Sequence, residues 1–527
     1  MALSGAVNNI IVYLIQHFNV KSIDAAQISG IINGCTSVAP LFGAILSDSY
    51  FGSFRVVVFS SVVSLISMLM FTLTAAVPGL QPPPCAPGST ECQPASLGQL
   101  AVLYGAVALM SIGTGGTRFN SMAMGANQFD DQQDQNVFFN WYLVLLSISS
   151  ILGATVIVYI EDNVSWATGF GVCAAASAVA VITLLLGFRY YRRTRIKGSP
   201  FTSMARVIVA SLKKRKLEPA NDSSAYYHAI GNGVQPVTPV LPTKSFSFLN
   251  RAALVTDGDA NGDGSIAKPW RLCTVRQVED LKTLIRIIPL WTSTIFITVC
   301  IATQMNFSIL QALTMDRAVS RRFSIPAGSL VVIALAANAV ALSLLDRAIY
   351  PALQRLAGIN PTPLQRIGVG CLLNVASMVA SALIEKRRGD IVRAHHATDD
   401  PRWTVPMPVL WLLLPFALTG LGEAFHFPGQ IAFYYQEFPK SLKSTATGLI
   451  ALIIAIGFYI STAVIHLVRR TTTWLPDNIN NSRIDKVYWL LAVLAAINYG
   501  YFILCAKLYK LQCRVDKNLN QQKTGNN

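Results

Sequence analysis

Long apolar runs recur along the whole of this 527-residue chain and limit what it can fold into. Each run holds about 20 residues, enough for a helix to cross a hydrocarbon core of about 30 Å. Hydrophobic residues make up 52% of the chain and charged residues only 13%, which is about half the charged share of a soluble domain. The pattern predicts an all-α membrane protein with eleven full spans near 28–47, 55–77, 99–120, 138–160, 167–188, 277–302, 326–346, 364–384, 407–432, 444–468 and 487–507.

The chain opens with a shorter apolar stretch, from Ser4 to Phe18. It is too short to cross a bilayer, and it has neither the charged n-region nor the cleavage site of a signal peptide. We interpret it as the second half of a first transmembrane helix whose beginning is missing from this sequence. A naturally shortened, tilted or re-entrant segment is the alternative.

Basic residues predict the orientation and the domain limits. The stretch 189–276 holds fifteen Lys and Arg against five acids, and such residues favour the cytoplasmic side. We expect an N-terminal helix bundle (1–188), this stretch as a cytoplasmic linker, a C-terminal bundle (277–510) and a basic cytoplasmic tail (511–527). The basic loop 385–393 falls on the outer side of the membrane and is the exception to this rule. Juxtamembrane charge attracts anionic lipid head groups, so the net charge of +16 points to membrane lipids rather than nucleic acid.

The sequence offers no metal or cofactor site. Its nine cysteines form no CxxC pair and no cluster with histidine. The residues from Asp257 imitate a calcium loop, but Lys268 stands where a bidentate glutamate is needed. Cys85 and Cys92 share a predicted outer loop and are candidates for a disulfide. Asn480 begins an Asn-Asn-Ser sequence, a possible glycan acceptor in another outer loop.

Glu423 lies in the middle of an apolar run, MPVLWLLLPFALTGLGEAFHFPGQIAFYYQEF. A charge at membrane depth costs about 2.5–3.5 kcal/mol even on a lenient scale, and such residues mark ion and substrate pathways. We therefore interpret Glu423 as a proton or substrate site. The alternative is a glutamate that a neighbouring helix neutralises for structural reasons alone.

The two halves of the chain carry similar charged segments. GAILSDSYFGSFR follows the second span in a tight cytoplasmic turn, and LLDRAIYPALQR follows the eighth span at the matching place. Two six-helix halves joined by a long linker are typical of major facilitator transporters, whose halves rock around a midplane site. We expect these segments to act as gate latches, with ordinary topology charges as the alternative; the residues concerned are Gly43, Asp48, Gly52, Arg55, Asp346, Arg347 and Arg355.

Five motifs make a family resemblance specific: GAILSDSYFG, GTGGTRFNSMAMGANQFDD, FFNWY, DGSIAKPWRLCTVRQVEDLK and GLGEAFHFPGQIAFYYQEFPKSLKSTATGL. From about Ser4 to Lys510 the chain resembles the plant nitrate transporter/peptide transporter family, part of the proton-coupled oligopeptide transporters. SGAVNNIIVYLIQHFNVKSIDAAQIS and GEAFHFPGQ most resemble its nitrate-excretion-transporter clade. The resemblance implies a proton-coupled transporter of the major facilitator fold, with two six-helix bundles.

The resemblance also implies residue roles. Family members place a basic residue after paired glycines in the fourth helix, here Arg118, and a glutamate in the tenth, here Glu423. In the family, these two residues form a salt bridge between the halves. Protonation of the glutamate opens the salt bridge, so that the basic residue can hold an anion. Opposite buried charges on facing helices lower each other's cost. Two family features are missing, namely a Glu-x-x-Glu-Arg motif in the first helix and a nitrate-contacting histidine in the seventh, where Ala302 stands.

Polar residues inside apolar spans are the further candidates for lining a central site. His426 and Gln430 follow Glu423 at helical spacing and share its face. His426 titrates near neutral pH and is a candidate proton relay, although a histidine that hydrogen-bonds between helices is the commoner case. The other candidates are Asn8, Asn9, Tyr13, Asn140, Trp141, Gln304 and Asn306.

We therefore expect proton-coupled, low-affinity transport of nitrate, as uptake or efflux, across the plasma membrane or alternatively the vacuolar membrane. Chloride, short peptides and plant metabolites are the alternative cargoes within the family. A sensor that binds nitrate without moving it is a different class of function. A membrane enzyme is not expected, because the sequence shows no metal ligands, nucleophile elbow or paired catalytic carboxylates.

Overall fold

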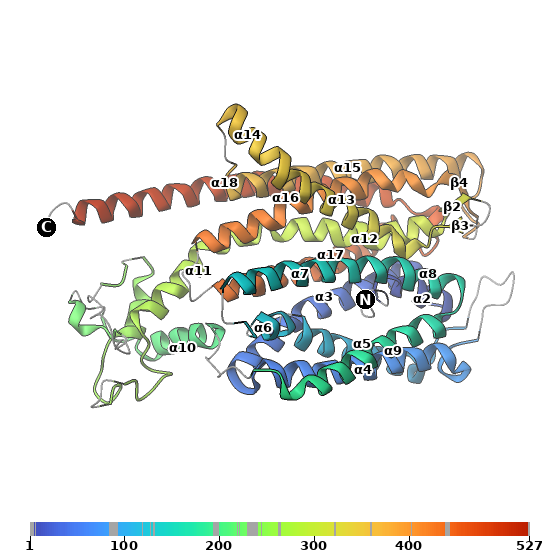
Figure 1. The fold of residues 1–527 in the computed structure, drawn as a ribbon. Helices are drawn as coiled ribbons and strands as arrows, with labels where there is room; N and C mark the ends of the chain where they lie inside the picture. Colours follow the sequence, from blue (N-terminus) through green and yellow to red (C-terminus); the bar gives the residue numbers. More distant parts are fainter. Residues whose placement is uncertain are drawn as a thin grey trace.

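The computed structural model is a bundle of long helices (Figure 1). It describes residues 5, 7–83, 93–118, 120–126, 128–129, 132–192, 200–218, 220, 222–228, 241–243, 245–261, 265–320, 323–358, 361–401, 403–437 and 443–524. The N-terminal half contains α2 (Ile10–His17), α3 (Ser22–Leu46), α4 (Ser53–Ala76), α5 (Leu97–Thr117), α6 (Asn120–Ala126), α7 (Gln132–Leu152), α8 (Val158–Asn163) and α9 (Trp166–Leu186). After α10 (Pro200–Lys213) come α11 (Val275–Ser293), α12 (Ile295–Leu313), α13 (Val331–Leu344), α14 (Tyr350–Ala357), α15 (Pro363–Ala394), α16 (Leu413–Glu437), α17 (Lys443–Thr471) and α18 (Ile484–Thr524).

The long helices pack in two groups. In the N-terminal half, α4 contacts α5 and α9, and α3 contacts α5. In the C-terminal half, α15 contacts α16 and α18, and α13 contacts α16. The two groups meet where α3 and α12 come together and where α3 packs against α17. Two helical groups in contact agree with the similarity between the halves of the sequence.

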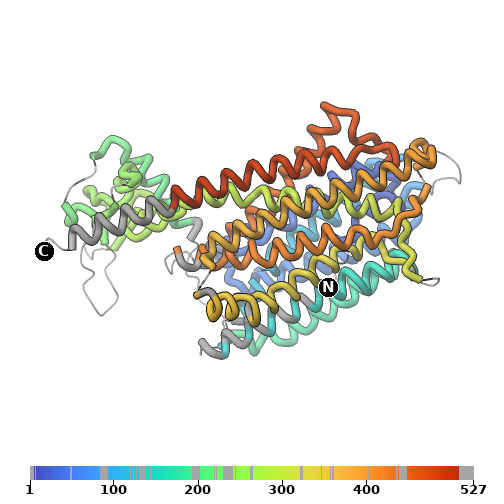
Figure 2. Tube along the Cα trace, turned by 90° about the horizontal axis from the view of Figure 1, so that it is seen from above, coloured from blue at the N-terminus to red at the C-terminus, as the bar shows by residue number. Residues whose placement is uncertain are grey.

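The two ends of the bundle differ (Figures 1 and 2). One end, which we name the strand end, carries β1 (Met315–Asp316), β2 (Ala318–Ser320), β3 (Phe323–Ser324) and β4 (Val405–Pro408). β1 pairs with β4 in parallel, and β2 pairs with β3 antiparallel. The other, the linker end, carries α10 and the last part of α18. These strands are too short to give a periodic signal in the sequence.

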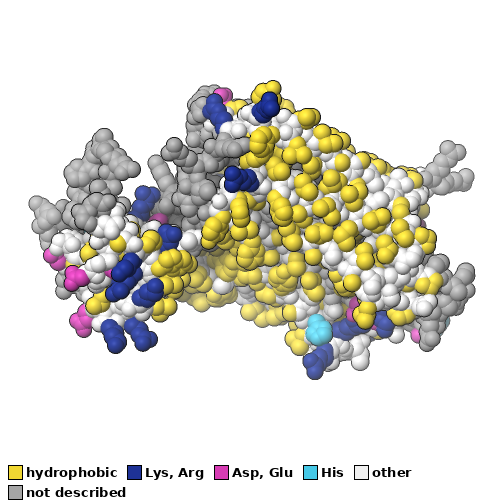
Figure 3. All heavy atoms as spheres, turned by 90° about the horizontal axis from the view of Figure 1, so that it is seen from below, with side chains coloured by type: hydrophobic (Ala, Val, Ile, Leu, Met, Phe, Trp, Pro, Cys, Tyr) yellow, Lys and Arg dark blue, Asp and Glu magenta, His cyan; other side chains and the backbone are white. Residues whose placement is uncertain are grey.

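Ten helices in the described part of the chain are long and apolar enough to cross a membrane. They correspond to ten of the eleven predicted full spans. The remaining span, 138–160, is helical through α7, the π-helical segment η3 (Gly153–Ile157) and α8, but it is not among the ten. Hydrophobic side chains form a broad apolar surface over the bundle (Figure 3). The chain is therefore a multi-pass membrane protein.

The opening apolar stretch is a core element of the N-terminal half. α2 has only eight residues, so it is about 12 Å long and crosses less than half of a hydrocarbon core. Tyr13 is completely buried in it, and its ring lies 4.9 Å from that of Trp166 and 5.2 Å from that of Phe170. The hydroxyl of Tyr13 bonds to Thr74 Oγ1 at 3.0 Å.

The linker contains a folded unit with its own small core. Apolar residues of α10, of the 3₁₀ segment η6 (Ser247–Ala253) and of the first turns of α11 pack together. Beside them, Lys214 Nζ lies 2.7 Å from Asp259 Oδ2, and both side chains are buried. Asp259 belongs to the calcium-like stretch, so this carboxylate is committed to a lysine rather than directed at a metal.

The basic stretch 385–393 is helical, which corrects its prediction as an outer loop. α15 continues to Ala394. Within it, Arg388 Nη2 lies 2.7 Å from Glu385 Oε1, and the exposed fractions of these side chains are 1% and 2%. A buried arginine that is neutralised in this way does not act as a topology charge, so the exception to the predicted orientation becomes weaker.

Asn480 is not available for glycosylation, so that prediction was wrong. Its side chain is buried, and Nδ2 donates hydrogen bonds to the backbone oxygens of Asp400 and Trp403 at 2.9 and 3.0 Å. The nitrogen that would carry a glycan is therefore held inside the fold. The proposed disulfide between Cys85 and Cys92 lies outside the described residues.

Glycines of the GTGG motif let α5 pack closely on its neighbours. A Cβ at Gly113 would lie 2.1 Å from Ser64 Oγ, and a Cβ at Gly115 would lie 2.8 Å from the backbone oxygen of Ala39. At Gly116 it would lie 1.7 Å from Ser60 Oγ and 2.5 Å from Ser60 Cβ. The motif therefore serves helix packing, since small residues allow close helix contacts in membranes.

We expect Gly116→Ala to destabilise the protein by about 1–3 kcal/mol through overpacking. Rotation of Ser60 would move Oγ away, but it would leave its Cβ in conflict. Gly171→Ala in α9 is the matched control, because a Cβ there meets nothing within 4 Å and alanine favours the helix by about 1 kcal/mol. The measurement is the midpoint of thermal unfolding in detergent. Equal losses for both variants would contradict the packing argument.

Candidate functional site

Glu423 lies near the middle of α16 and is half-buried. Its Oε2 accepts a hydrogen bond from Asn338 Nδ2 on α13 at 3.4 Å. Gly420 lets the two helices approach, because a Cβ there would lie 2.3 Å from the backbone oxygen of Ala334. In the described part of the chain, no cation lies within ion-pair distance of Glu423. A neutral partner leaves its carboxyl group able to exist in either protonation state.

Arg118 follows the last residue of α5, and its backbone N–H still donates to the oxygen of Thr114 at 3.1 Å. Its side chain is exposed and forms no ion pair with a described residue. The expected salt bridge between Arg118 and Glu423 is therefore absent in this conformation. A guanidinium in a membrane span is costly if it faces lipid, which favours a water-filled path beside Arg118.

His426 and Gln430 do not line a site with Glu423, contrary to the prediction. His426 is completely buried against α15, where a Cβ at Gly370 would lie 2.7 Å from His426 Cβ. Gln430 is 1% exposed, and its side-chain amide nitrogen, Nε2, donates a hydrogen bond to Thr294 Oγ1 at 2.9 Å. Both residues therefore hold helices of the C-terminal half together.

Several other predicted lining residues are also part of helix packing. Gln304 is 1% exposed and donates to Ser377 Oγ at 3.0 Å, while Thr419 Oγ1 donates to Gln304 Oε1 at 2.6 Å. This network ties α12 to α15 and α16. Tyr13, Asn9 and Asn306 are buried as well.

Three of the predicted residues differ from this pattern. Asn8 is half-buried, and Trp141 is exposed on α7. The side chain of Asn140 lies outside the described part of the structure. Arg118 and Glu423 therefore remain the ionisable candidates for a central site.

Both predicted gate segments contain a π-helical turn. Asp48 lies in η1 (Ser47–Phe51), and Asp346 and Arg347 lie in η8 (Leu345–Ile349). The side chains of the two aspartates lie outside the described part of the structure. Arg347 is exposed, and so is Arg55 at the start of α4. π-Helical turns are rare and are frequent at functional sites, so their presence at matching places supports the internal similarity.

The two predicted gate glycines have clear backbone roles. Gly43 allows α3 to touch α5, because a Cβ there would lie 2.1 Å from the oxygen of Gly115. Gly52 has a φ of 77°, a conformation that favours glycine. It separates η1 from α4 and so sets the direction of the chain at this corner.

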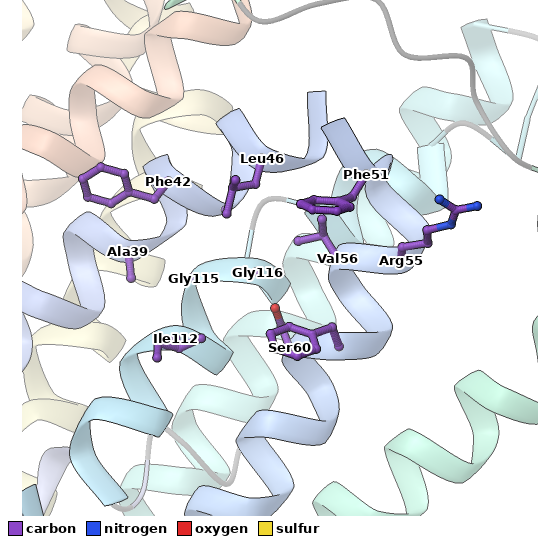
Figure 4. A pocket seen from close by; sticks show the side chains of 12 residues that line it. Ala39, Phe42, Leu46, Phe51, Arg55, Val56, Ser60, Ile112, Gly115 and Gly116 are labelled. Atoms are coloured by element: carbon purple, nitrogen blue, oxygen red, sulfur yellow. The ribbon is translucent and has the colours of Figure 1, made fainter. Parts of the chain in front are cut away.

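An apolar pocket of about 590 Å³ lies between α3, α4 and α5 (Figure 4). Gly43 and Arg55 help to line it, together with apolar side chains such as Phe42, Leu46 and Ile112. The Arg55 guanidinium points away from the other lining side chains (Figure 4). Arg118 and Glu423 do not line this pocket, so it is separate from the central candidates.

Ion pairs that sequence reasoning missed join the two halves at the strand end. Lys21 Nζ lies 2.5 Å from Asp477 Oδ2. Arg469 pairs with Asp24 and, through Nη2 and Oδ1 at 2.7 Å, with Asp477. Lys21 and Asp477 are 456 positions apart in the chain, so no local pattern could have indicated the contact. These pairs hold α3 against α17 at the strand end.

Comparison with known proteins agrees with this architecture. The profile of the POT family, PTR2, matches residues 54–487. The chain belongs to the POT family. It is similar to Protein NRT1/PTR FAMILY 2.7 of Arabidopsis thaliana, with 47% identity over 96% of this chain and 89% of that protein. It is also similar to Protein NRT1/PTR FAMILY 2.3 of the same plant, with 44% identity over 98% and 91% of the two chains.

Solved structures of this family share the fold. The POT family transporter PepTSo matches with a TM-score of 0.70 at 16% sequence identity, over 97% of this chain and 96% of that chain. The protein is thus a membrane transporter of the POT family with the major facilitator fold. The sequence-based predictions of family and fold class are confirmed.

Proposed function

We propose that this POT-family transporter couples proton movement to the transport of a small anion, and we expect that anion to be nitrate. The observation that carries the proposal is a pair of intramembrane charges, Arg118 in one half and Glu423 in the other. Neither has a counter-ion among the described residues. Ionisable groups at membrane depth usually serve a transport pathway.

The chemistry follows from the two protonation states of Glu423. When Glu423 is protonated, it carries no charge, and the planar fork of Arg118 is available for an oxyanion with several acceptor oxygens. When the anion and the proton have left, the carboxylate attracts Arg118 across the halves. Proton and anion are then coupled by electrostatics alone. The acceptor geometry favours nitrate over chloride, which cannot bind in a bidentate manner.

The conformation also fits a rocking carrier. The halves are joined by ion pairs at the strand end, and the basic linker predicts that the opposite end is cytoplasmic. We propose that this is an inward-facing state of a plasma-membrane protein, with the vacuolar membrane as the alternative.

Uptake of labelled nitrate into proteoliposomes with an imposed pH gradient tests the proposal. We expect nitrate to accumulate when the outside is acidic and chloride and dipeptides to compete poorly. Absence of any gradient-driven nitrate uptake by correctly incorporated protein would overturn it.

We expect Arg118→Gln to raise the KM for nitrate by about 10- to 100-fold, because a hydrogen bond to a charged group contributes about 1.5–3 kcal/mol. Arg118→Lys keeps the charge but loses the fork, so its KM should lie in between. Arg393→Gln is the control, since this arginine is exposed and pairs with Asp390 at the surface. An unchanged KM in Arg118→Gln would remove Arg118 from the anion site.

A further inference from the structure

Glu161 and Asp162 form an acidic pair on α8, just beyond the predicted span 138–160. Glu161 is 1% exposed, and its Oε2 accepts a hydrogen bond from Asn9 Nδ2 at 3.0 Å. The same nitrogen lies 3.5 Å from Asp162 Oδ1. Gly169 on α9 covers the side chain, because a Cβ there would lie 2.4 Å from Glu161 Cγ. Glu161 is therefore a carboxyl group enclosed by α2, α8 and α9.

This enclosed group has too few hydrogen-bond donors. Glu161 Oε1 has no partner among the described residues, and neither has Asn9 Oδ1. Within the described chain, no cation lies at ion-pair distance from Glu161; the buried thiol of Cys173 on α9 faces it and adds no positive charge. Unpaired buried acceptors beside a second carboxylate are costly, and one bound proton would relieve both the missing donor and the repulsion.

The acidic pair lies where the two halves of the transporter meet. Arg317, between β1 and β2 of the C-terminal half, places Nη1 3.8 Å from Asp162 Oδ2. Gly328, in the 3₁₀ segment η7 (Ala327–Leu330), packs so closely that a Cβ there would lie 2.7 Å from Asn9 Oδ1. Separation of the halves at the strand end would therefore uncover the residues that enclose Glu161 and admit water to it.

We propose that Glu161 is a second proton-binding site, which holds a proton while the halves are closed at the strand end and releases it when they separate. The proposal deepens the proposed proton-coupled function and rests on it. With the proton bound, the charges of Asp162 and Arg317 balance. Without it, the closed junction encloses an uncompensated negative charge, which favours opening to water.

The expected pH dependence follows from this exchange. In the closed junction, burial and the charge of Asp162 outweigh the bond from Asn9 and raise the pKa of Glu161 to about 8. In an open, hydrated junction the ordinary value of about 4.3 applies. The proton on Glu161 thus fully favours closure of the junction when the pH is below the lower of these two pKa values. This contribution is lost as the pH rises through the higher pKa. Between them, each pH unit changes the ratio of closed to open protein by up to about tenfold.

Infrared spectroscopy of the purified full-length protein tests the site directly. We expect the wild type to show a component of the carboxylic-acid C=O band that disappears between about pH 6 and about pH 9 and is missing in Glu161→Gln, where the component from Glu423 remains. Asp390→Asn, at an exposed carboxylate, should keep the band. If Glu161→Gln does not fold, Glu161→Asp should shift the frequency and midpoint of the band. A titrating band that is identical in the wild type and the Glu161 variant would overturn the proposal.

Transport separates this proposal from the proposed function. In proteoliposomes, Glu161→Gln should retain exchange of nitrate and lose most of the pH dependence of gradient-driven uptake, whereas Glu161→Asp should recover it in part. An unchanged pH profile in Glu161→Gln would count against Glu161 alone. If the wild type moves no nitrate, the proposed function fails, and the infrared band still decides whether Glu161 binds a proton.

Discussion

Replacement of Glu423 by glutamine is expected to uncouple anion transport from the pH gradient and to leave exchange intact. Glutamine keeps the size of the side chain and can still bond to Asn338, which now holds the carboxylate at 3.4 Å. It can neither bind nor release a proton, so the affinity of Arg118 for the anion no longer follows pH. With one proton per anion, a gradient of one pH unit supports about tenfold accumulation in the wild type, and we expect almost none in the variant.

The measurement compares gradient-driven uptake with counterflow of labelled nitrate in the same proteoliposomes. Asp390→Asn is the control, because that carboxylate is exposed and pairs with Arg393 at the surface. Loss of both activities in Glu423→Gln would indicate misfolding or a direct role in anion binding. Undiminished, pH-dependent accumulation would remove Glu423 from the coupling mechanism.

The features that sequence reasoning found are those that depend on local composition. The length of the apolar runs correctly predicted ten membrane-spanning helices in the described chain, because a helix needs about 20 residues to cross a bilayer. The paired glycines before Arg118 stand out in the sequence as well, and in the structure they allow close contacts between helices. Glu423 was conspicuous for a similar reason, namely a charge within an apolar run.

The features that sequence reasoning missed depend on which helix faces which. Helical spacing correctly put His426 near Glu423 along α16, but three residues turn the side chain toward a different neighbour, and His426 meets α15 instead of α13. The ion pair between Arg469 and Asp24 joins residues 445 positions apart. Only the packing of the two halves brings such residues together.

The contacts of Arg388 also depend on helix packing and could not be predicted from the sequence. They lead to a second prediction, which concerns the stability of the protein. All five N–H donors of its guanidinium are used: two bind the carboxylate of Glu385, and the others reach Thr314 Oγ1, Asn480 Oδ1 and the oxygen of Ile479 at 3.1 Å each. Gln311 Nε2 donates to the same carboxylate at 2.6 Å. One side chain therefore joins α15, the end of α12 and the segment before α18.

We expect Arg388→Met to lower the stability of the protein by about 3–5 kcal/mol, because it leaves the buried carboxylate of Glu385 without its counter-ion. The double variant Glu385→Leu/Arg388→Met should lose much less, since a well-packed apolar pair can replace a buried ion pair at little cost. The measurement is the midpoint of thermal unfolding in detergent.

The control is Arg393→Met on the same helix, with the same spacing of three residues to its partner Asp390. That pair is exposed, so its loss should cost less than about 1 kcal/mol. The ranking of the three variants decides the argument, because it separates loss of an ion pair from isolation of a buried charge. A double variant as unstable as Arg388→Met would show that the bonds to Thr314, Asn480 and Ile479 matter more than the charge of Glu385.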